Sequence, residues 1–376
     1  MEVLVLNSGS SSIKYRLFDT DLAVVASGLI ERIGEPTGRA IHRLHAGGER
    51  REQVEEGAIA DHAAGFHSLV AALDAAGLGE DLGAIGHRVV HGGSEFVAPT
   101  RIDEQVIERI RAQIPLAPLH NPANLTGIEV ATQLRPDLPQ VAVFDTAFHG
   151  TLPPHAYHYA VPEEVHREHG VRRYGFHGTS HAFVARRAAA HLGRPAEELD
   201  LVTLHLGNGA SAAAVKGGRS VDTSMGLSPL EGLVMGTRSG DLDPAVVFHL
   251  VRQAGMSLDE VDTLLNKRSG LLGLCGDNDL REIERRAGEG DEAAALALDV
   301  YTYRIRKYLG AYTAALGGLE LFGIVLDDAR NRAADTGASD DGVVPVQADD
   351  SRVAVLVIAT DEEHEIAEQT RVALGA

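Results

Sequence analysis

The chain is short of cysteine, of basic residues and of long apolar segments, and each shortage excludes a class of protein. Cys275 is the only cysteine among 376 residues, so no disulfide can form within the chain and a reducing compartment is expected. The 34 Lys and Arg residues are outnumbered by 54 Asp and Glu residues, giving a formal net charge of −20. Nucleic-acid and anionic-membrane partners are therefore not expected, because both require a basic face. The sequence shows no secretion signal and no run near the roughly 18 apolar residues of a membrane span.

The length and the hydrophobic pattern favour an α/β protein of two domains, since 376 residues exceed one usual hydrophobic core. Runs typical of strands alternate with helical patterns. The strand-like runs are residues 3–7, 84–93, 140–148, 201–209 and 352–360, and the helical patterns are 61–77, 180–193 and 291–316. Residues 243–274 predict two short helices, with Gly255 closing the first and Ser257 capping the second. The Pro-rich residues 114–124 predict an irregular loop.

A turn rich in small hydroxyl residues joins the first two predicted strands. Residues 8–12, "SGSSS", offer backbone N–H groups and hydroxyls with little bulk, which suits a closely approaching anion such as phosphate. Lys14 adds a cation. The spacing is not that of a P-loop, and residues 13–19 alternate like a strand, so we predict a β-hairpin that holds phosphate. A hairpin turn without a ligand is the alternative, and this stretch alone does not decide between them.

A weaker copy of this pattern occurs half a chain later. Residues 201–218 again run strand, Gly/Ser turn and strand, which predicts duplicated domains that each offer a hairpin to phosphate. The letters "GNGASA" also fit the dinucleotide-binding pattern G-x-G-x-x-A. That pattern requires a following helix, whereas only residues 211–215 precede the next turn, so a short strand is predicted instead.

Four polar motifs could carry chemistry: "GHRVVHGG" with Arg88, "VFDTAFHG" with Asp145, "YGFHGTSH" with His177 and His181, and "MGTRSGDLDP" with Arg238. Each charged group lies beside a glycine or at the end of an apolar run, where an α/β sheet presents catalytic side chains. An arginine can hold carboxylate or phosphoryl oxygens with two nitrogens, and a histidine can donate to charge that develops during transfer. Without the neighbouring motifs, an ordinary ion pair would be the preferred explanation for either arginine.

Three of the polar positions allow more than one role. His177 and His181 have the spacing of zinc ligands on a helix, but the motif lacks a Glu and contains a glycine, so metal binding is not favoured. Asp145 could contact a metal, act as a base or form an Asx turn. Glu362 could bind a cation or stabilise a helix N-terminus.

Taken together, the motifs resemble those of the acetate kinase family, which shares its fold with sugar kinases, heat-shock ATPases and actin. In family order they are "NSGSSSIKY", "HRVVHGG", "HNPAN", "VFDTAFH", "YGFHGTSH", "HLGNGAS", "DTSMGLSPLEG", "MGTRSGDLDP" and "TDEE". The resemblance implies an α/β fold of two ribonuclease-H-like domains (a duplicated βββαβαβα core) flanking a nucleotide cleft. It implies an N-terminal domain at 1–149, joined by a C-terminal helix at 364–376, and a nucleotide-binding domain at 150–363.

The resemblance also implies a reaction: reversible phosphoryl transfer from ATP to acetate, giving acetyl phosphate and ADP by direct in-line displacement. ATP or ADP would be the co-substrate, and Mg²⁺, or Mn²⁺ in its place, the metal. The expected protein is a cytoplasmic homodimer without nucleic-acid or membrane partners. A propionate or butyrate kinase is the alternative, because one methylene is worth only about 1 to 3 kcal/mol of discrimination.

Residue roles follow from the same resemblance. For catalysis it implies Arg88, Asp145, His177 and Arg238, with the histidine stabilising the transition state. For acetate it implies Arg88 and an apolar pocket of Val90, Leu119 and Pro229. For ATP it implies Ser10, Ser12, Lys14, His205, Leu206, Gly207, Asn208, Gly209, Asp279, Leu280 and Arg281. For the metal it implies Asn7 and Glu362.

One family segment has no counterpart here. In the family a stretch like "YTAALGG" leads into a strand and a "GGIGEN" turn around the nucleotide, whereas here it runs directly into "LELFGIVLDD". The apparent deletion lies between Gly318 and Leu319 and corresponds to roughly 20 to 25 residues at usual element lengths. Loss of a central strand leaves backbone groups unpaired, each costing about 1 to 3 kcal/mol when buried. We therefore hypothesise weak ATP binding, and a catalytically impaired nucleotide-binding protein is a second alternative.

Overall fold

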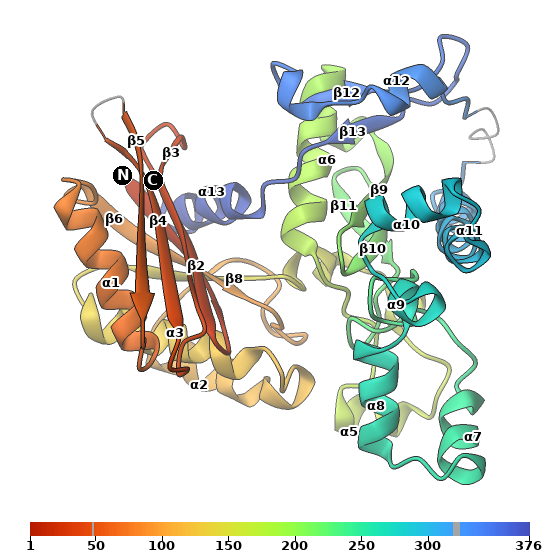
Figure 1. Ribbon diagram of the computed structural model, residues 1–376, viewed down its shortest axis with the longest axis horizontal. Helices are drawn as coiled ribbons and strands as arrows, with labels where there is room; N and C mark the ends of the chain where they lie inside the picture. Colours follow the sequence, from red (N-terminus) through yellow and green to blue (C-terminus); the bar gives the residue numbers. More distant parts are fainter. Residues whose placement is uncertain (47–48, 319–323) are drawn as a thin grey trace. The chain divides into compact units, whose positions relative to one another are not determined.

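The computed structural model describes residues 1–46, 49–318 and 324–376 (Figure 1). The chain divides into two compact units. Unit 1 comprises Met1–Gly150 with Asp361–Ala376, and unit 2 comprises Thr151–Thr360. Within the described ranges, no helix combines the length and the apolar character needed to cross a bilayer. Strands and helices alternate along both units, which confirms the α/β class predicted from the sequence.

Unit 1 is built on an eight-stranded mixed sheet in the order β5-β4-β3-β2-β1-β6-β8-β7. Its strands are β1 Glu2–Gly9, β2 Ser12–Phe18, β3 Val24–Glu31, β4 Gly38–Ala46, β5 Glu49–Gly57, β6 Leu82–Val89, β7 Thr100–Arg101 and β8 Gln140–Phe144. Strand β1 pairs antiparallel with β2 and parallel with β6, and β6 pairs parallel with β8. The order β3-β2-β1-β6-β8 is that of the predicted ribonuclease-H-like core. Parallel β6 and β8 therefore end at the same edge of the sheet.

The predicted hairpin at the start of the chain is confirmed. Gly9 faces Ser12 in the β1–β2 register, so Ser10 and Ser11 form a two-residue turn. Alternating side chains of β1 enter two different cores. Leu4 and Leu6 belong to one buried cluster and Val3 and Val5 to another.

Helices cover both faces of this sheet. The helices of unit 1 are α1 His62–Ala75, α2 Glu104–Ala112, α3 Asn121–Leu134 and α13 Glu362–Leu374, with short 3₁₀ turns η1 Ile114–Leu116 and η2 Ala147–Thr151. Phe66 and Leu69 of α1 join the cluster that contains Leu4 and Leu6. Ile366 of α13 joins the cluster of Val3 and Val5 on the opposite face (Figure 1). The C-terminal helix is thus part of the unit 1 core.

The expectation of an irregular loop over 114–124 is wrong in part. Residues Ile114–Leu116 form η1, and helix α3 already begins at Asn121 with Pro122 in its first turn. Proline fits there because the first backbone N–H groups of a helix have no intrahelical acceptor. The Pro-rich composition therefore marked a helix start.

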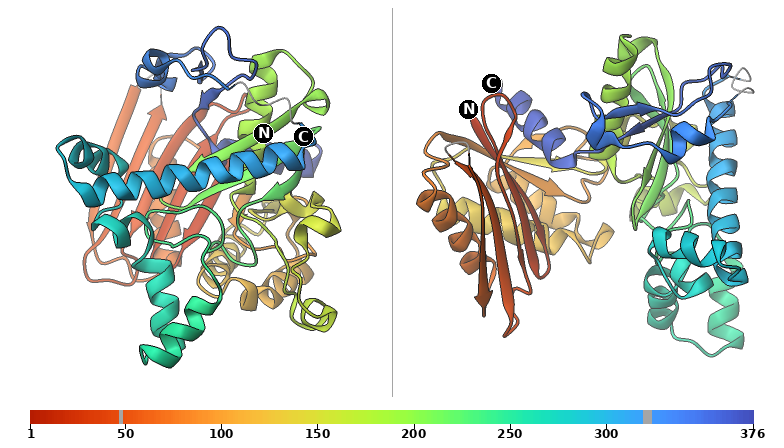
Figure 2. Two further views of the ribbon diagram at one scale, coloured as in Figure 1. Left: turned by 90° about the vertical axis from the view of Figure 1, so that its right-hand side faces the viewer. Right: turned by 45° about the horizontal axis from the view of Figure 1, so that its top comes forward.

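Unit 2 contains a three-stranded antiparallel sheet in the order β11-β10-β9 and a separate pair, β12–β13. The strands are β9 Asp200–Leu206, β10 Ala210–Lys216, β11 Arg219–Thr223, β12 Val343–Pro345 and β13 Leu356–Ile358. The helices are α4 Pro154–Tyr157, α5 Glu163–His169, α6 Gly178–Leu192, α7 Ala245–Gln253, α8 Leu258–Lys267, α9 Gly270–Cys275, α10 Leu280–Gly288, α11 Glu292–Ala315 and α12 Asp328–Arg332, with 3₁₀ turns η3 Ala196–Glu198 and η5 Thr336–Ala338. Helices α6 and α11 both pack against the sheet (Figure 2).

Several local predictions in unit 2 are confirmed. Residues 210–216 form strand β10, as the short interval after "GNG" predicted, and not a dinucleotide-binding helix. Ser257 caps α8 through a capping box with Glu260. Gly255, at φ +70°, follows the end of α7. The strand expected over 352–360 is limited to β13, which pairs with β12 outside the three-stranded sheet.

Strand β9 lies at a sheet edge, unlike its counterpart β1. Strand β1 is paired on both sides, whereas in the part of the chain that the structure describes β9 pairs only with β10. All residues of β10 except Lys216 are buried, but in β9 only Thr203 is, and Leu206 is 45% exposed. This half-open edge is what a missing neighbouring strand would leave. The predicted deletion point itself adjoins Leu319, which lies outside the described residues.

Ion pairs attach the start of α13 to strand β2. Arg16 Nη1 donates to both carboxylate oxygens of Asp361 at 2.8 Å, and Lys14 pairs with Glu363. Burial alone would raise the pKa of Glu363, but Lys14 and Arg16 outweigh it and hold the pKa below the usual 4.5. Because the folded-state pKa is depressed, this stabilisation is present above about pH 4.5 and is lost as the pH falls through the folded-state value.

Replacing Glu363 with glutamine is therefore expected to cost about 1 kcal/mol of unfolding free energy at pH 7. The cost is expected to shrink below about pH 4, where the wild-type carboxyl becomes protonated. Urea unfolding of both proteins at the two pH values measures the difference. An equal loss at both would contradict this account.

Candidate active site

In unit 1, Arg88 and Asp145 lie at the ends of neighbouring parallel strands. Val89 faces Phe144 in the β6–β8 register, so Arg88 and Asp145 meet at the carboxyl edge of the sheet. Arg88 Nε donates to Oδ1 of Asp145 at 3.0 Å, and Nη2 donates to Oδ2 at 2.6 Å. Asp145 is only 1% exposed. The aspartate, whose role the sequence left open, is thus the orienting partner of an arginine.

The remaining nitrogen of Arg88 is available to a ligand. Burial alone would lower the pKa of the guanidinium, but Asp145, with Glu362 and Glu363, outweighs burial and raises it. Arg88 is therefore a permanent cation. Its Nε and Nη2 are occupied, while Nη1 has no hydrogen-bond partner among the described residues. A guanidinium oriented through one edge and open at another can grip an incoming anion.

Two buried asparagines of α3 fix the chain that follows Arg88. Asn124 Oδ1 accepts from the Val90 backbone N–H at 3.0 Å, and its Nδ2 donates to the Ser8 carbonyl at 2.8 Å. Asn121 clamps His91 in the same way through both of its amide atoms. This explains physically why "HNPAN" accompanies "HRVVHGG". Leu119, just before the helix, is 66% exposed, so unit 1 does not enclose it beside Val90.

The hairpin residues Ser10, Ser12 and Lys14 differ in whether they are open to a phosphate. Ser10 is exposed at the turn, and Ser12 begins β2. Lys14 faces Asn7 in the register, but its ammonium contacts Glu363. A phosphate at this hairpin would therefore compete with a carboxylate for Lys14.

Asn7 and Glu362 fit a magnesium ion held mainly by a nucleotide. Asn7 follows Leu6, which faces His87 in the β1–β6 register, and Glu362 acts electrostatically on Arg88, so both belong to the same edge of unit 1. Amide and carboxylate oxygens are ligands that Mg²⁺ prefers, usually completed by phosphates and water. In the described ranges, no group of three or more His, Cys, Asp or Glu side chains could hold a metal alone. The zinc alternative for His177 and His181 gains no support.

In unit 2, His177 occupies a strained position at the start of α6. Its φ is +57°, in the left-handed region that L-residues rarely adopt. Its ring stacks on His205 with centroids 4.1 Å apart. Its Nδ1 is 2.9 Å from Oγ of the buried Ser211. The backbone conformation and the ring contacts with His205 and Ser211 together fix the orientation of the His177 imidazole.

Arg238 lies beside the same imidazole and has no counter-ion among the residues that the structure describes. A Cβ built on Gly209 would be 3.4 Å from Arg238 Nη1 and 3.4 Å from His177 Nε2, so both nitrogens border one glycine. Nη1 donates to the carbonyl of Pro229 at 3.1 Å, and no carboxylate contacts the guanidinium within the described part of the chain. Burial lowers the pKa of Arg238 below the usual value of a guanidinium. A half-buried cation without a counter-charge is a site for an anion.

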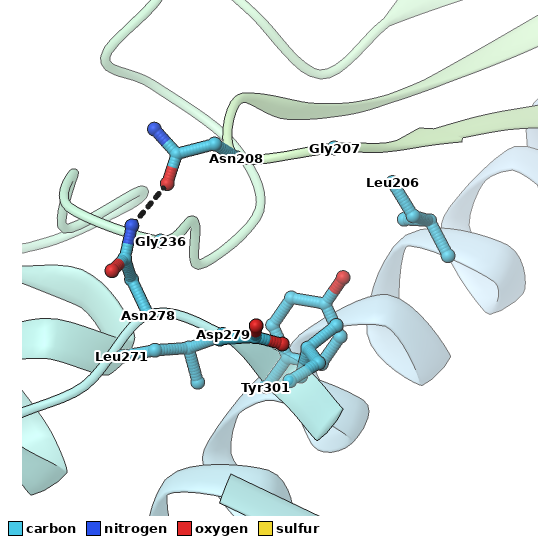
Figure 3. Close-up of a pocket in the computed structure, with 9 residues that line it drawn as sticks. Leu206, Gly207, Asn208, Gly236, Leu271, Asn278, Asp279 and Tyr301 are labelled. Carbon is cyan, nitrogen blue, oxygen red and sulfur yellow. Dashed lines mark hydrogen bonds between the residues drawn. The ribbon is translucent and has the colours of Figure 1, made fainter. Parts of the chain in front are cut away.

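A pocket of about 380 Å³ lies at the end of β9 (Figure 3). It is lined by Leu206, Gly207, Asn208, Gly236, Leu271, Asn278, Asp279, Leu280 and Tyr301. Asn278 donates to Oδ1 of Asn208 at 2.9 Å across it. A Cβ at Gly236 would be 2.0 Å from Asn208 Oδ1, so any larger residue there would displace the Asn208 side chain from its hydrogen bond with Asn278. The Tyr301 hydroxyl is buried without a hydrogen-bond partner in the described ranges.

The structure brings together some of the residues predicted for ATP and separates others. Leu206, Gly207, Asn208, Asp279 and Leu280 share the pocket. His205 and Gly209 lie instead beside His177. Arg281 is 90% exposed and pairs with Asp279, holding the pKa of that carboxyl at about 2. Leu271, Asn278 and Tyr301 were missed, because nothing in the local sequence of a helix or loop predicts which side chain faces a pocket.

These features define a class. The mixed sheet of unit 1, the oriented Arg88, the uncompensated Arg238 beside His177 and the pocket at β9 are typical of a phosphotransferase with an actin-like fold. The two arginines and the histidine handle negative charge, and the pocket has the size of a ligand.

Comparisons with known proteins identify the family. The family model described as the Acetokinase family matches residues 2–320. The chain is 57% identical over 401 residues to an acetate kinase of Streptomyces avermitilis, covering 99% of this chain and 97% of the relative. The crystal structure of Porphyromonas gingivalis acetate kinase matches with a TM-score of 0.91 and 41% identity, and that of a propionate kinase from Francisella tularensis with 0.90 and 38%, each over 99% of both chains. The chain therefore belongs to the acetokinase family, and the predicted fold is confirmed.

The alignment also bears on the missing segment. It spans 401 positions, whereas this chain has 376 residues, so at least 25 positions of the Streptomyces relative have no counterpart here. The family match ends at residue 320, beside the predicted deletion after Gly318. The position of the deletion stays a prediction.

Proposed function

We propose that the protein is an acetate kinase, which transfers a phosphoryl group reversibly between ATP and acetate. The observation that carries the proposal is Arg238, a half-buried guanidinium without a carboxylate partner in the described ranges, beside Nε2 of His177 at Gly209. Such a cation gains stability when a phosphoryl group or carboxylate binds. Near-full-length similarity to acetate kinases supports acetate as the acceptor.

The proposed roles follow from the chemistry of phosphoryl transfer, which requires positioning and charge neutralisation more than covalent catalysis. Arg88, oriented by Asp145, holds carboxylate or phosphoryl oxygens through its open edge. Arg238 neutralises charge on the transferring group, and His177 donates a hydrogen bond to it from Nε2. These groups act as a preorganised electrostatic environment for in-line attack of acetate on the γ-phosphorus.

The nucleotide is proposed to bind in the 380 Å³ pocket. Leu206 and Leu271 offer apolar surface to the base, while Asp279 and the Tyr301 hydroxyl offer polar contacts. The hairpin residues Ser10, Ser12 and Lys14 remain the proposed phosphate contacts. Asn7 and Glu362 would hold Mg²⁺, which when bound neutralises phosphate charge and aligns the β- and γ-phosphates.

The comparisons favour acetate kinase over the two alternatives. The curated relatives at 50 to 57% identity are acetate kinases, whereas the propionate kinase structure is 38% identical. Val90 and Pro229 are proposed to contact the acetate methyl, and Leu119 would join them only if its exposed side chain is covered on binding.

The test is a chain-length series of carboxylates with ATP and magnesium, read by trapping the acyl phosphate as a hydroxamate. Acetate is expected to give the highest kcat/KM, with propionate roughly 10-fold or more lower because an added methylene must fit the apolar pocket. Higher turnover with propionate or butyrate would favour the alternative kinase. No product with any acid, together with no heat in calorimetry with ATP and magnesium, would favour the impaired scaffold.

A homodimer and a cytoplasmic location complete the proposal. No residue of helix α7 is buried in the part of the chain that the structure describes. Its Val246 and Phe248 are 38% and 55% exposed. We propose that a second subunit covers these apolar side chains. Light scattering at micromolar concentration should give twice the chain mass of 39.9 kDa. A cytoplasm would supply ATP and keep the buried Cys275 reduced.

A further inference from the structure

A chain of buried side chains lies behind His177. Nδ1 of His177 is 2.9 Å from Ser211 Oγ, which in turn is 2.8 Å from Nε2 of His181. Nδ1 of His181 is 2.8 Å from Thr203 Oγ1. Ser211, His181 and Thr203 are 0%, 1% and 5% exposed, so bulk solvent does not reach these contacts. These hydrogen bonds connect α6 with strands β9 and β10.

The Ser211 hydroxyl has one proton and contacts two imidazoles, so it donates to one ring and accepts from the other. If it donates to Nδ1 of His177, the proton of a neutral His177 must reside on Nε2, the nitrogen that borders Gly209. Ser211 then accepts from Nε2–H of His181, and Nδ1 of His181 accepts from the Thr203 hydroxyl. In this arrangement each of the three hydrogen bonds between these side chains has one donor and one acceptor. With all donors reversed, a neutral His177 presents a bare Nε2, which cannot donate to an anion.

We propose that Ser211, backed by His181 and Thr203, is the positioning residue that holds His177 in the Nε2–H tautomer facing the transferring phosphoryl group. The inference rests on the proposed function for the identity of that group. His177 is the residue that touches the reacting atoms, and Ser211 acts through it. A buried hydroxyl that selects a tautomer controls a catalytic hydrogen bond without contacting the substrate.

The first experiment needs no activity. Nitrogen chemical shifts of histidine-labelled protein distinguish an imidazole protonated at Nε2 from one protonated at Nδ1, and the His177→Gln spectrum identifies the signal of His177. We expect the Nε2–H form in the wild-type protein and a mixture of both tautomers in Ser211→Ala. An Nδ1–H form in the wild type would overturn the proposal even if the protein is an active acetate kinase.

The second experiment is kinetic. Ser211→Ala is expected to lower kcat about 10- to 100-fold while the KM values for acetate and ATP stay within about twofold, because the lost interaction belongs to the transition state. The matched control is Ser224→Ala, which removes another fully buried hydroxyl that accepts from the backbone N–H of Ala212. Equal loss of kcat in both variants would mean that Ser211 is merely structural.

A pair of substitutions at His181 covers the case in which Ser211→Ala fails to fold. Glutamine can place an amide N–H near the position of Nε2 and donate to Ser211, whereas alanine cannot. His181→Gln is therefore expected to keep most of the wild-type kcat, and His181→Ala to lose about as much as Ser211→Ala. Equal kcat for the two His181 variants would overturn the proposal.

Discussion

The Arg88→Leu and Arg238→Leu variants are expected to lose activity to a similar extent but to differ in stability. Each should lower kcat/KM for acetate at least about a thousandfold, the scale reported for arginines that neutralise a transferring phosphoryl group. Arg88→Leu also strands the buried carboxylate of Asp145, which is 1% exposed. Removing one partner of a buried ion pair costs about 3 to 5 kcal/mol.

Arg238→Leu leaves no carboxylate stranded, because none contacts this guanidinium in the described part of the chain. Its unfolding free energy should stay within about 1 kcal/mol of wild type or rise, since a half-buried charge without a counter-ion is removed. Initial-rate kinetics and urea unfolding measure the two quantities. Arg332→Leu, which alters an ion pair with Asp328 at 79% exposure, is the control expected to change neither.

Two outcomes would contradict this interpretation. Wild-type stability of Arg88→Leu would show that Asp145 does not depend on its arginine in the folded protein. Activity of Arg238→Leu within tenfold of wild type would show that the uncompensated cation does not act on the reacting group.

The parts of the fold predictable from sequence were those set by local chemistry. The β1–β2 hairpin follows from alternation and from small residues at the turn, and the α8 cap follows from Ser257 with Glu260. The interval 114–124 was mispredicted because proline has two local meanings, a breaker inside a helix and a favoured residue in its first turn. Only the packing of Asn121 and Asn124 against the chain after β6 distinguishes them.

The site shows the same limit. Arg88 and Asp145 could be predicted as polar residues at strand ends, but their pairing required the β6–β8 register, which joins residues 57 positions apart. Ser211 carried no signal, because a serine among alanines in a buried strand is typical of a packed core. Its contact with two histidines depends on the tertiary position of α6 relative to β10.

We expect ATP to bind at least tenfold more tightly when this chain receives the segment that the Streptomyces relative contains and this chain lacks. The insertion would follow Gly318 and supply a strand beside β9, whose described residues pair only with β10. Leu206 is 45% exposed at the end of β9 and also lines the proposed nucleotide pocket. Covering this edge would pair open backbone groups and fix the strand that presents Leu206, Gly207 and Asn208, so less of the binding free energy would be spent on ordering the site.

Calorimetry with ATP and magnesium measures the affinity, and amide hydrogen exchange measures protection along β9. A Gly/Ser insertion of equal length after Gly318 is the matched control, because it lengthens the chain without offering a strand. The restored protein could bind ATP with unchanged affinity, and the β9 amides could exchange as slowly in the 376-residue chain as in the restored protein. Together these results would mean that the β9 edge is already stabilised without the insertion. In that case the exposed face of β9 would not limit nucleotide binding, and the shorter second sheet would be a tolerated variation of the family fold.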